Sequence, residues 1–278
     1  MQERRPKGLG KPGPLASVPS KWPRLIYDLG AANGDDSAYY LSQGFRVVAV
    51  EARPDAIADL RRRFAAEISD GRLVLVAKGI AERSGEATFL LCEDIPEWST
   101  FDPAFARRWG QRHRPITVPT TTFRALLEEF GPATYCKIDI EGSDHLCLAD
   151  PGVGDLPHYL SMEFCEAIEP LVSRLSELGY RRFKLISQLR FEHPSPTLAQ
   201  AKARFRHAPN IIRWAYRHLA RFASRLKPRS PCGPSGPFGE ATAGPWRTAE
   251  AVVELAAMVR ATDAQTDWYD LHAALGDD

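Results

Sequence analysis

The fold of this chain is decided by residues 25–34, which read LIYDLGAANG. The apolar run at 25–27 has the composition of a buried strand, and Asp28 closes it. Gly30 and Gly34 then allow the backbone to turn sharply and to approach a ligand where a Cβ atom would clash. The order of strand, glycine turn and helix start is typical of the first unit of a nucleotide-binding sheet.

The same alternation of apolar strands and helices continues along the chain. Further strands are predicted at 46–50, 73–77, 135–138, 159–162 and 182–186, with a terminal strand at 268–272. Helices are predicted at 35–43, 54–69, 121–130, 143–149, 166–178 and 248–261. Short apolar strands separated by helices indicate a doubly wound α/β fold with a mostly parallel sheet covered on both faces. The arginine-rich stretch 103–115 interrupts the alternation and is expected to be a loop over the active face.

Composition excludes several classes of protein. The 278 residues are 44% hydrophobic and 26% charged, with a net charge of +1, which excludes a disordered or fibrous chain. No run reaches the roughly 20 apolar residues of a membrane span, and the first twenty residues lack the apolar core of a signal peptide, so we expect a cytoplasmic protein. The five cysteines form no C-x-x-C pair, which predicts reduced thiols and no zinc site.

Basic charge is concentrated in two parts of the chain. Residues 1–22 hold five Lys and Arg against one Glu and are predicted to be a disordered leader. Residues 181–230 hold thirteen Lys and Arg against Glu192 alone. We therefore expect one catalytic domain at 23–278 that carries a basic helical insertion at about 188–232.

The glycine turn and the next strand predict a nucleoside ligand. The dinucleotide pattern G-x-G-x-x-G is absent, because Ala32 and Asp35 occupy two of its glycine positions. Acidic residues at the helix start would repel a pyrophosphate, so the sulfonium and amino-acid tail of S-adenosylmethionine fit better than NAD. Glu51 ends the second strand, where a carboxylate can accept hydrogen bonds from both hydroxyls of a ribose.

Three motifs together resemble the FkbM-type family of S-adenosylmethionine-dependent methyltransferases. They are IYDLGAANG at 26–34, VAVEARP at 48–54 and KIDIEG at 137–142. The resemblance implies a class I methyltransferase fold, with a seven-stranded sheet whose final strand is reversed, and O-methylation of a hydroxyl on a sugar or natural product. It also implies the cofactor-binding residues, which are Asp28, Gly30, Ala31, Asn33, Gly34, Glu51, Ala52 and Arg53.

The motif after the fourth strand supplies the catalytic candidates. Asp139 or Glu141 is expected to hold the acceptor hydroxyl and take its proton, with Lys137 beside them. His145, predicted on the next helix, is an alternative base, and Glu163 is a second candidate for acceptor contact. Carboxylates clustered locally without a distant partner are weak evidence for a metal, and no metal is expected.

Three other functions remain open at this point. A dehydrogenase would use the same sheet, a nucleic-acid methyltransferase would suit the basic insertion, and a nucleoside-binding module would need no chemistry. The sequence of residues 196–230 predicts an amphipathic helix whose arginines are spaced along one face. This segment is expected to pack on the sheet edge or to meet an anionic membrane or lipid-linked glycan, and nucleic acid is the weakest alternative because no binding motif accompanies the charge.

Overall fold

The computed structural model describes most of the chain outside its two basic segments. The described ranges are 24–108, 110–149, 156–163, 168–188, 191–194, 235–263 and 268–276. The expected leader at 1–22 and the expected helix within 196–230 lie outside these ranges, as do Cys165 and Cys232. The other three cysteines are buried free thiols, as predicted.

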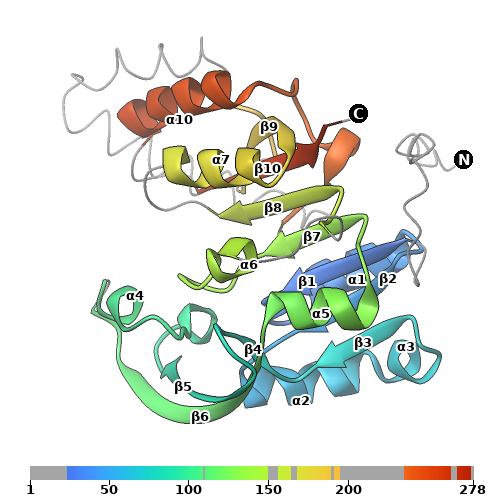
Figure 1. Cartoon of the computed structure of the whole chain (residues 1–278). Helices are drawn as coiled ribbons and strands as arrows, with labels where there is room; N and C mark the ends of the chain where they lie inside the picture. The colour runs from blue at the N-terminus through green and yellow to red at the C-terminus, as the bar shows by residue number, and fades with distance from the viewer. Residues whose placement is uncertain are drawn as a thin grey trace, which may run out of the picture.

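A seven-stranded sheet forms the centre of the molecule (Figure 1). Its strands are β1 (Leu25–Leu29), β2 (Arg46–Val50), β3 (Leu73–Val76), β7 (Tyr135–Ile138), β8 (Tyr159–Glu163), β9 (Tyr180–Ser187) and β10 (Tyr269–Leu275). Their order in space is β3-β2-β1-β7-β8-β10-β9. β10 runs antiparallel to both β8 and β9, while the β1, β2, β3, β7 and β8 pairs are parallel. The predicted mostly parallel sheet with a reversed final strand is confirmed.

Helices cover both faces of this sheet because its strands are apolar on both sides. One face packs against α1 (Asp35–Ser42) and α2 (Pro54–Arg63), followed by the short α3 (Ala65–Ser69). The opposite face packs against α5 (Phe123–Phe130), α6 (Leu146–Ala149), α7 (Ile168–Glu177) and α10 (Ala249–Asp263). In β1, Ile26 joins the first core and Tyr27 the second, and Asp28 therefore lies on the α1 face.

A second, three-stranded sheet was not predicted. It contains β4 (Gly79–Ile80), β5 (Gly85–Cys92) and β6 (His113–Thr121) in the order β4-β6-β5. The prediction of a loop at 103–115 is wrong, because this stretch contains the short helix α4 (Pro103–Arg107) and the start of β6. Two prolines in β6 mask its strand character. The prolines are tolerated because β4 pairs with β6 only at residues 120–121. Among the described residues, the rest of the β6 edge that faces β4 has no partner strand.

Two predicted helices differ most from the observed ones. The helix expected at 54–69 is interrupted at Phe64, whose φ of −110° leaves the helical range. The helix expected at 143–149 begins only at Leu146, because the chain first makes a turn that includes His145. Within the described residues no helix has the length and apolar character needed to cross a membrane.

Candidate functional site

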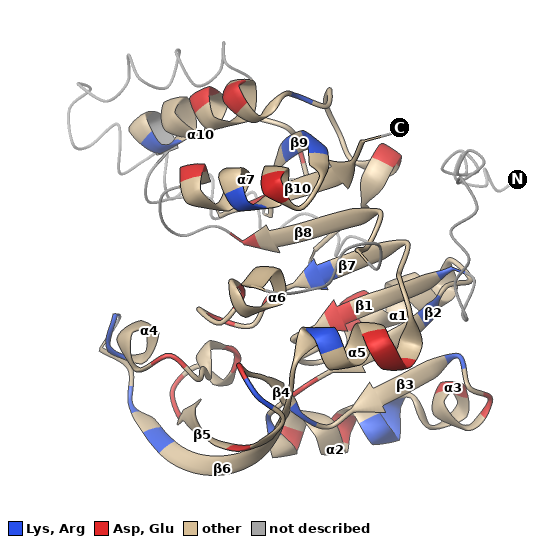
Figure 2. Cartoon of the chain, viewed as in Figure 1, with Lys and Arg blue, Asp and Glu red and all other residues tan. Residues whose placement is uncertain are grey.

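The candidate site lies where β1, β7 and β8 end and the antiparallel β10 begins. Charged residues gather at this edge of the sheet: in Figure 2 the ends of β1 and β8 are acidic and the end of β7 is basic. Parallel strands present their carboxyl ends at one edge, so residues distant in sequence meet there. The register pairs Asp28 with Lys137 across β1 and β7, and Glu163 with Asp270 across β8 and β10.

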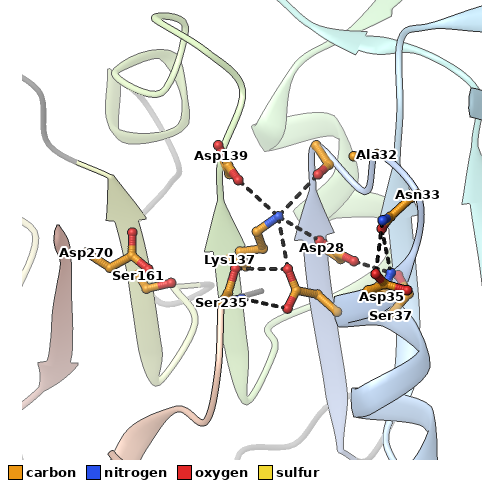
Figure 3. A network of polar contacts seen from close by, with 12 residues as sticks. Asp28, Ala32, Asn33, Asp35, Ser37, Lys137, Asp139, Ser161, Ser235 and Asp270 are labelled. Atoms are coloured by element: carbon orange, nitrogen blue, oxygen red, sulfur yellow. Dashed lines mark hydrogen bonds and ion pairs between the residues drawn. The ribbon is translucent and has the colours of Figure 1, made fainter. Parts of the chain in front are cut away.

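Lys137 is the centre of the polar network (Figure 3). Its Nζ lies 3.5 Å from Asp28 Oδ1, 3.4 Å from Asp36 Oδ2 and 3.3 Å from Asp139 Oδ2, and it donates a hydrogen bond of 3.2 Å to the carbonyl of Gly30. The side chain is 7% exposed. Three neighbouring carboxylates keep this buried amine charged, since they raise its pKa against the opposing effect of desolvation.

The three aspartates around Lys137 differ in their access to solvent. Asp28 and Asp36 are buried, whereas the side chain of Asp139 is 37% exposed. Burial raises the pKa of Asp28 to about 6, although Lys137 and a hydrogen bond of 2.6 Å from Ser37 Oγ favour its charged form. A ligand at this edge can therefore reach the carboxylate of Asp139 but not that of Asp28. The carboxylate of Asp28 instead accepts the hydrogen bond from Ser37 of α1.

A residue far along the chain completes the network. Ser235 donates two hydrogen bonds to Asp36, one from its backbone N to Oδ1 and one from its Oγ to Oδ2, both of 2.9 Å. These bonds connect the segment before β10 to the start of α1. The sequence could not have shown this contact, because 199 residues separate the two partners.

Glycine is required at two positions of the turn. Gly30 has a φ of +81°, and a Cβ atom there would lie 1.9 Å from the carbonyl oxygen of Asp139. Gly34 has a φ of +80°, and its Cβ would contact Phe64 and Leu60 of the α2 region. Ala31 is buried, and its N donates to the carbonyl of Val50 at 3.0 Å. The turn is thus pressed against β7 on one side and α2 on the other.

Glu51 stabilises the backbone of two neighbouring turns. Its carboxylate accepts hydrogen bonds from the N–H groups of Ala32, Ala52 and Arg53, at 2.8, 2.9 and 2.8 Å. The carboxylate therefore joins the glycine turn to the turn after β2. Beside it, the buried Arg53 finds no hydrogen-bond acceptor for its Nε and Nη1 atoms among the described residues.

The acidic start of α1 repels an anionic ligand less than the sequence suggested. Asp35 forms an ion pair of 2.7 Å with Arg63, and Asp36 pairs with Lys137. Asn33, the exposed residue of the turn, accepts a hydrogen bond from the N of Asp35 at 3.0 Å. Arg63 thus offsets the charge of Asp35, whereas Asp36 shares Lys137 with Asp28 and Asp139, so the helix start keeps acidic character.

A second group of carboxyls lies next to the network. Glu141 leaves the strand conformation with a φ of +50°, and the hydroxyl of Thr100 donates to its carbonyl at 2.5 Å. Burial, with the nearby charges of Asp139, Glu163 and Asp144, raises the pKa of Glu141 to about 9. Glu141 is therefore protonated at neutral pH, where it can donate a hydrogen bond.

Asp270 is a site residue that the sequence analysis missed. It lies on β10, and its Oδ1 accepts a hydrogen bond of 2.8 Å from Gln188 Nε2. Burial, followed by the charges of Asp139 and Glu163, raises its pKa to about 7. The strand Trp268–His272 was predicted, but only the register of β10 against β8 brings Asp270 to the candidate site.

One other candidate, His145, has a different position from that expected. His145 is exposed in the turn before α6, and no contact between its side chain and the network is found in the described ranges. Asp144 accepts hydrogen bonds from the N–H groups of Ile140 and Gly142, both at 3.1 Å, and so stabilises the turn that carries Glu141. Among the described residues, no group of three or more His, Cys, Asp and Glu is arranged to hold a metal.

Comparison with known proteins identifies a family. The model of the family described as the methyltransferase FkbM domain matches residues 28–182, which is more than half of the chain. No curated protein matches.

Solved structures show weaker likenesses. A methyltransferase FkbM from Methylobacillus flagellatus KT is 16% identical with a TM-score of 0.31; the match covers 50% of this chain but only 32% of that one. A precorrin-6y C5,15-methyltransferase from Geobacter metallireducens GS-15 is 11% identical, with a TM-score of 0.37 and coverage of 91% and 80%. The O-methyltransferase of a trans-AT PKS multienzyme of Brevibacillus brevis, in complex with S-adenosyl-L-homocysteine, is 8% identical, with a TM-score of 0.38 and coverage of 91% and 67%. The family assignment rests on the family match and not on these structures.

The close approach of Gly30 to β7 yields a first prediction. Gly30→Ala and Gly44→Ala both place a side chain at positive φ, which costs about 1 kcal/mol of the free energy of unfolding. Only Gly30→Ala adds a clash with backbone, since a Cβ at Gly44 meets nothing within 4 Å. We expect Gly30→Ala to lose about 1–3 kcal/mol more than Gly44→Ala in urea unfolding. If both variants lost the same free energy of unfolding, the backbone after β7 would move away from the added methyl group at little cost.

The buried carboxyl of Glu141 predicts a pH dependence of stability. Because its folded pKa of about 9 is above its ordinary 4.5, the folded state binds the proton more tightly, and this stabilisation is lost as pH rises from 4.5 through 9. Glu141→Gln should therefore melt at a higher temperature than the wild type at pH 9 and at a similar temperature at pH 4.5. The control is Glu86→Gln, at an exposed site. If both variants follow the same melting profile, the carboxyl of Glu141 is not desolvated.

Proposed function

Because the chain belongs to the FkbM methyltransferase family, we propose that it transfers a methyl group from S-adenosylmethionine to a hydroxyl of a sugar or other natural product. The observation that carries this proposal is the carboxylate of Asp139, which is solvent-accessible, lies beside the glycine turn and is paired with the buried Lys137. Asp139 is the accessible member of a network whose other charged side chains, those of Asp28, Asp36 and Lys137, are buried.

The turn after β1 and the turn after β2 suit the proposed donor. Glu51 already accepts three backbone hydrogen bonds, two of them at Oε1, and its Oε2 keeps a lone pair that a ribose hydroxyl can use. Within the described residues two buried donors of Arg53 lack an acceptor, and a nucleoside offers ring nitrogens and hydroxyl oxygens that can supply one. Gly30 lets the turn pack directly against the backbone that follows β7, where a Cβ atom would lie 1.9 Å from the carbonyl oxygen of Asp139.

The charge of the edge favours a cationic donor. Lys137 contributes one positive charge against the carboxylates of Asp28, Asp36 and Asp139, which leaves the network negative when all three are ionised. Glu163 and Asp270 lie on the next two strands. S-adenosylmethionine has a sulfonium in addition to its amino-acid charges, and a negative site stabilises it more than it stabilises the neutral sulfide product.

The same residues can handle the proton of the acceptor. When bound, S-adenosylmethionine supplies an electrophilic methyl group. Asp139 can accept the hydroxyl proton, since its carboxylate is exposed, while the protonated Glu141 can donate a hydrogen bond to the acceptor. Lys137 is too buried to contact the acceptor, and we assign it a positioning role. Orientation of the two reactants can contribute roughly 7–11 kcal/mol, more than a general base usually does.

Other parts of the proposal concern location and partners. We propose that the protein works in the cytoplasm, and that residues 196–230, whose sequence is strongly basic, bring it to an anionic membrane or a lipid-linked glycan. The charge and spacing of Arg213, Arg217, Arg221 and Arg225 in the sequence support this role.

The experiment that tests the function supplies donor and acceptors together. Purified protein is incubated with S-adenosylmethionine and an extract of glycans and small metabolites from the source cells, and mass spectrometry identifies the species that gains a methyl group. Methylation of a hydroxyl supports the proposal. Methylation of an amine alone would correct the acceptor class, and absence of S-adenosylhomocysteine binding in calorimetry would overturn the donor assignment.

Asp139→Asn separates chemistry from donor binding. We expect this variant to lower kcat about 10²-fold or more, because the amide cannot take the proton, while its affinity for S-adenosylhomocysteine changes little. Asp55→Asn, at an exposed carboxylate of α2, is the control. Normal turnover by Asp139→Asn would place the base elsewhere, with Asp270 the next candidate.

A further inference from the structure

We propose that Trp268 is the stacking surface for a sugar ring of the acceptor, at a distance from the hydroxyl that is methylated. This inference rests on the proposed function, because it names residues that would recognise the acceptor of that reaction. Trp268 is 58% exposed and is the one large hydrophobic side chain that is exposed among the described residues. An exposed indole presents a large, rigid apolar face together with a polar N–H, which is why tryptophan is enriched at binding interfaces.

The backbone of Trp268 is fixed by the sheet. Its carbonyl accepts a hydrogen bond of 2.8 Å from the N of Gln188, which extends the pairing of β9 and β10 beyond Tyr269 and Ser187. The side chain of Gln188 also donates to Asp270 Oδ1 at 2.8 Å. One residue of β9 therefore positions both Trp268 and Asp270.

The alternation of β10 places Trp268 on the same side of the sheet as Asp270. Asp270 lies opposite Glu163 of β8, and β8 lies beside β7, the strand that leads to Asp139. From the donor side outward, the edge thus presents Asp139, Glu163, Asp270 and then Trp268. Neighbouring strands are about 4.8 Å apart, so β10 is about 10 Å from β7.

This order of groups fits a hydroxylated ring better than a cation or a flat aromatic ligand. A sugar has an apolar C–H face that stacks on an aromatic ring, and hydroxyls that both donate and accept hydrogen bonds. The carboxyls here offer both functions, since Glu141 is protonated at neutral pH and Asp270 titrates near pH 7. A quaternary ammonium group can neither donate nor accept a hydrogen bond, so it would leave the protonated carboxyl of Glu141 without an acceptor.

The separation between β7, which leads to Asp139, and β10, which follows Trp268, predicts the size of the acceptor. With the backbones of β7 and β10 about 10 Å apart, a first ring at Asp139 leaves room for a second ring on Trp268. The acceptor is therefore expected to contain at least two linked rings, with the outer ring methylated and the next ring on the indole.

Fluorine NMR of the full-length protein tests this directly. The protein is labelled with 5-fluorotryptophan, saturated with S-adenosylhomocysteine, and the Trp268 resonance is assigned by its absence in Trp268→Phe. The probes are the methyl glycosides of glucose, galactose and mannose, the disaccharides cellobiose, lactose and mannobiose, and choline. We expect disaccharides to shift the Trp268 resonance with at least about tenfold higher affinity than one-ring glycosides, because stacking adds to the contacts of the first ring.

Two variants and a separate binding measurement complete the design. Trp268→Ala should raise KM for the saccharide acceptor about tenfold with kcat unchanged, and Trp268→Phe should restore most of the loss because it keeps an aromatic face. A resonance that shifts with choline but not with saccharides, or with none of the probes, overturns the inference. Calorimetry with S-adenosylhomocysteine does not involve Trp268, so failure of donor binding would overturn the proposed function separately.

Discussion

The structure depends on the charge interaction between the buried Lys137 and the carboxylates of three chain segments. Asp28 ends β1, Asp36 begins α1, and Asp139 follows β7, and one ammonium lies within 3.5 Å of a carboxylate oxygen of each. A buried ion pair is not in itself a strong source of stability, because desolvation offsets much of the attraction. Its effect is specificity: removal of one partner would leave the others charged and buried, so the sheet edge and the helix start must be assembled in one arrangement.

The consequences of this interaction extend over the whole edge. Lys137 also donates to the carbonyl of Gly30, which holds the glycine turn against β7, while Asp36 carries two hydrogen bonds from Ser235. The glycine turn, the first helix and the segment that precedes the reversed strand are thus joined through one network. Of the three aspartates around Lys137, only Asp139 remains accessible to solvent.

The sequence predicted the central sheet well because its strands are short apolar runs that end in charged residues, as at Asp28 and Glu51. The contact of Lys137 with Asp28 was not predicted, because it arises from the register of β1 against β7. The second sheet was missed because prolines in β6 hide the strand pattern. Asp270 and Ser235 were missed for another reason: their roles arise from register and from contacts across long stretches of chain, and no local pattern marks them.

The most direct test of the account is the stability of Lys137→Met alone and combined with Asp28→Asn, measured by urea unfolding and by calorimetry with S-adenosylhomocysteine. The account predicts that Lys137→Met loses about 3–5 kcal/mol of the free energy of unfolding and loses ligand binding, because it leaves buried carboxylates without a cation. Adding Asp28→Asn should restore part of the stability, since one uncompensated charge is removed. A Lys137→Met variant that unfolds like the wild type and binds S-adenosylhomocysteine with the same affinity would contradict the central role of this lysine.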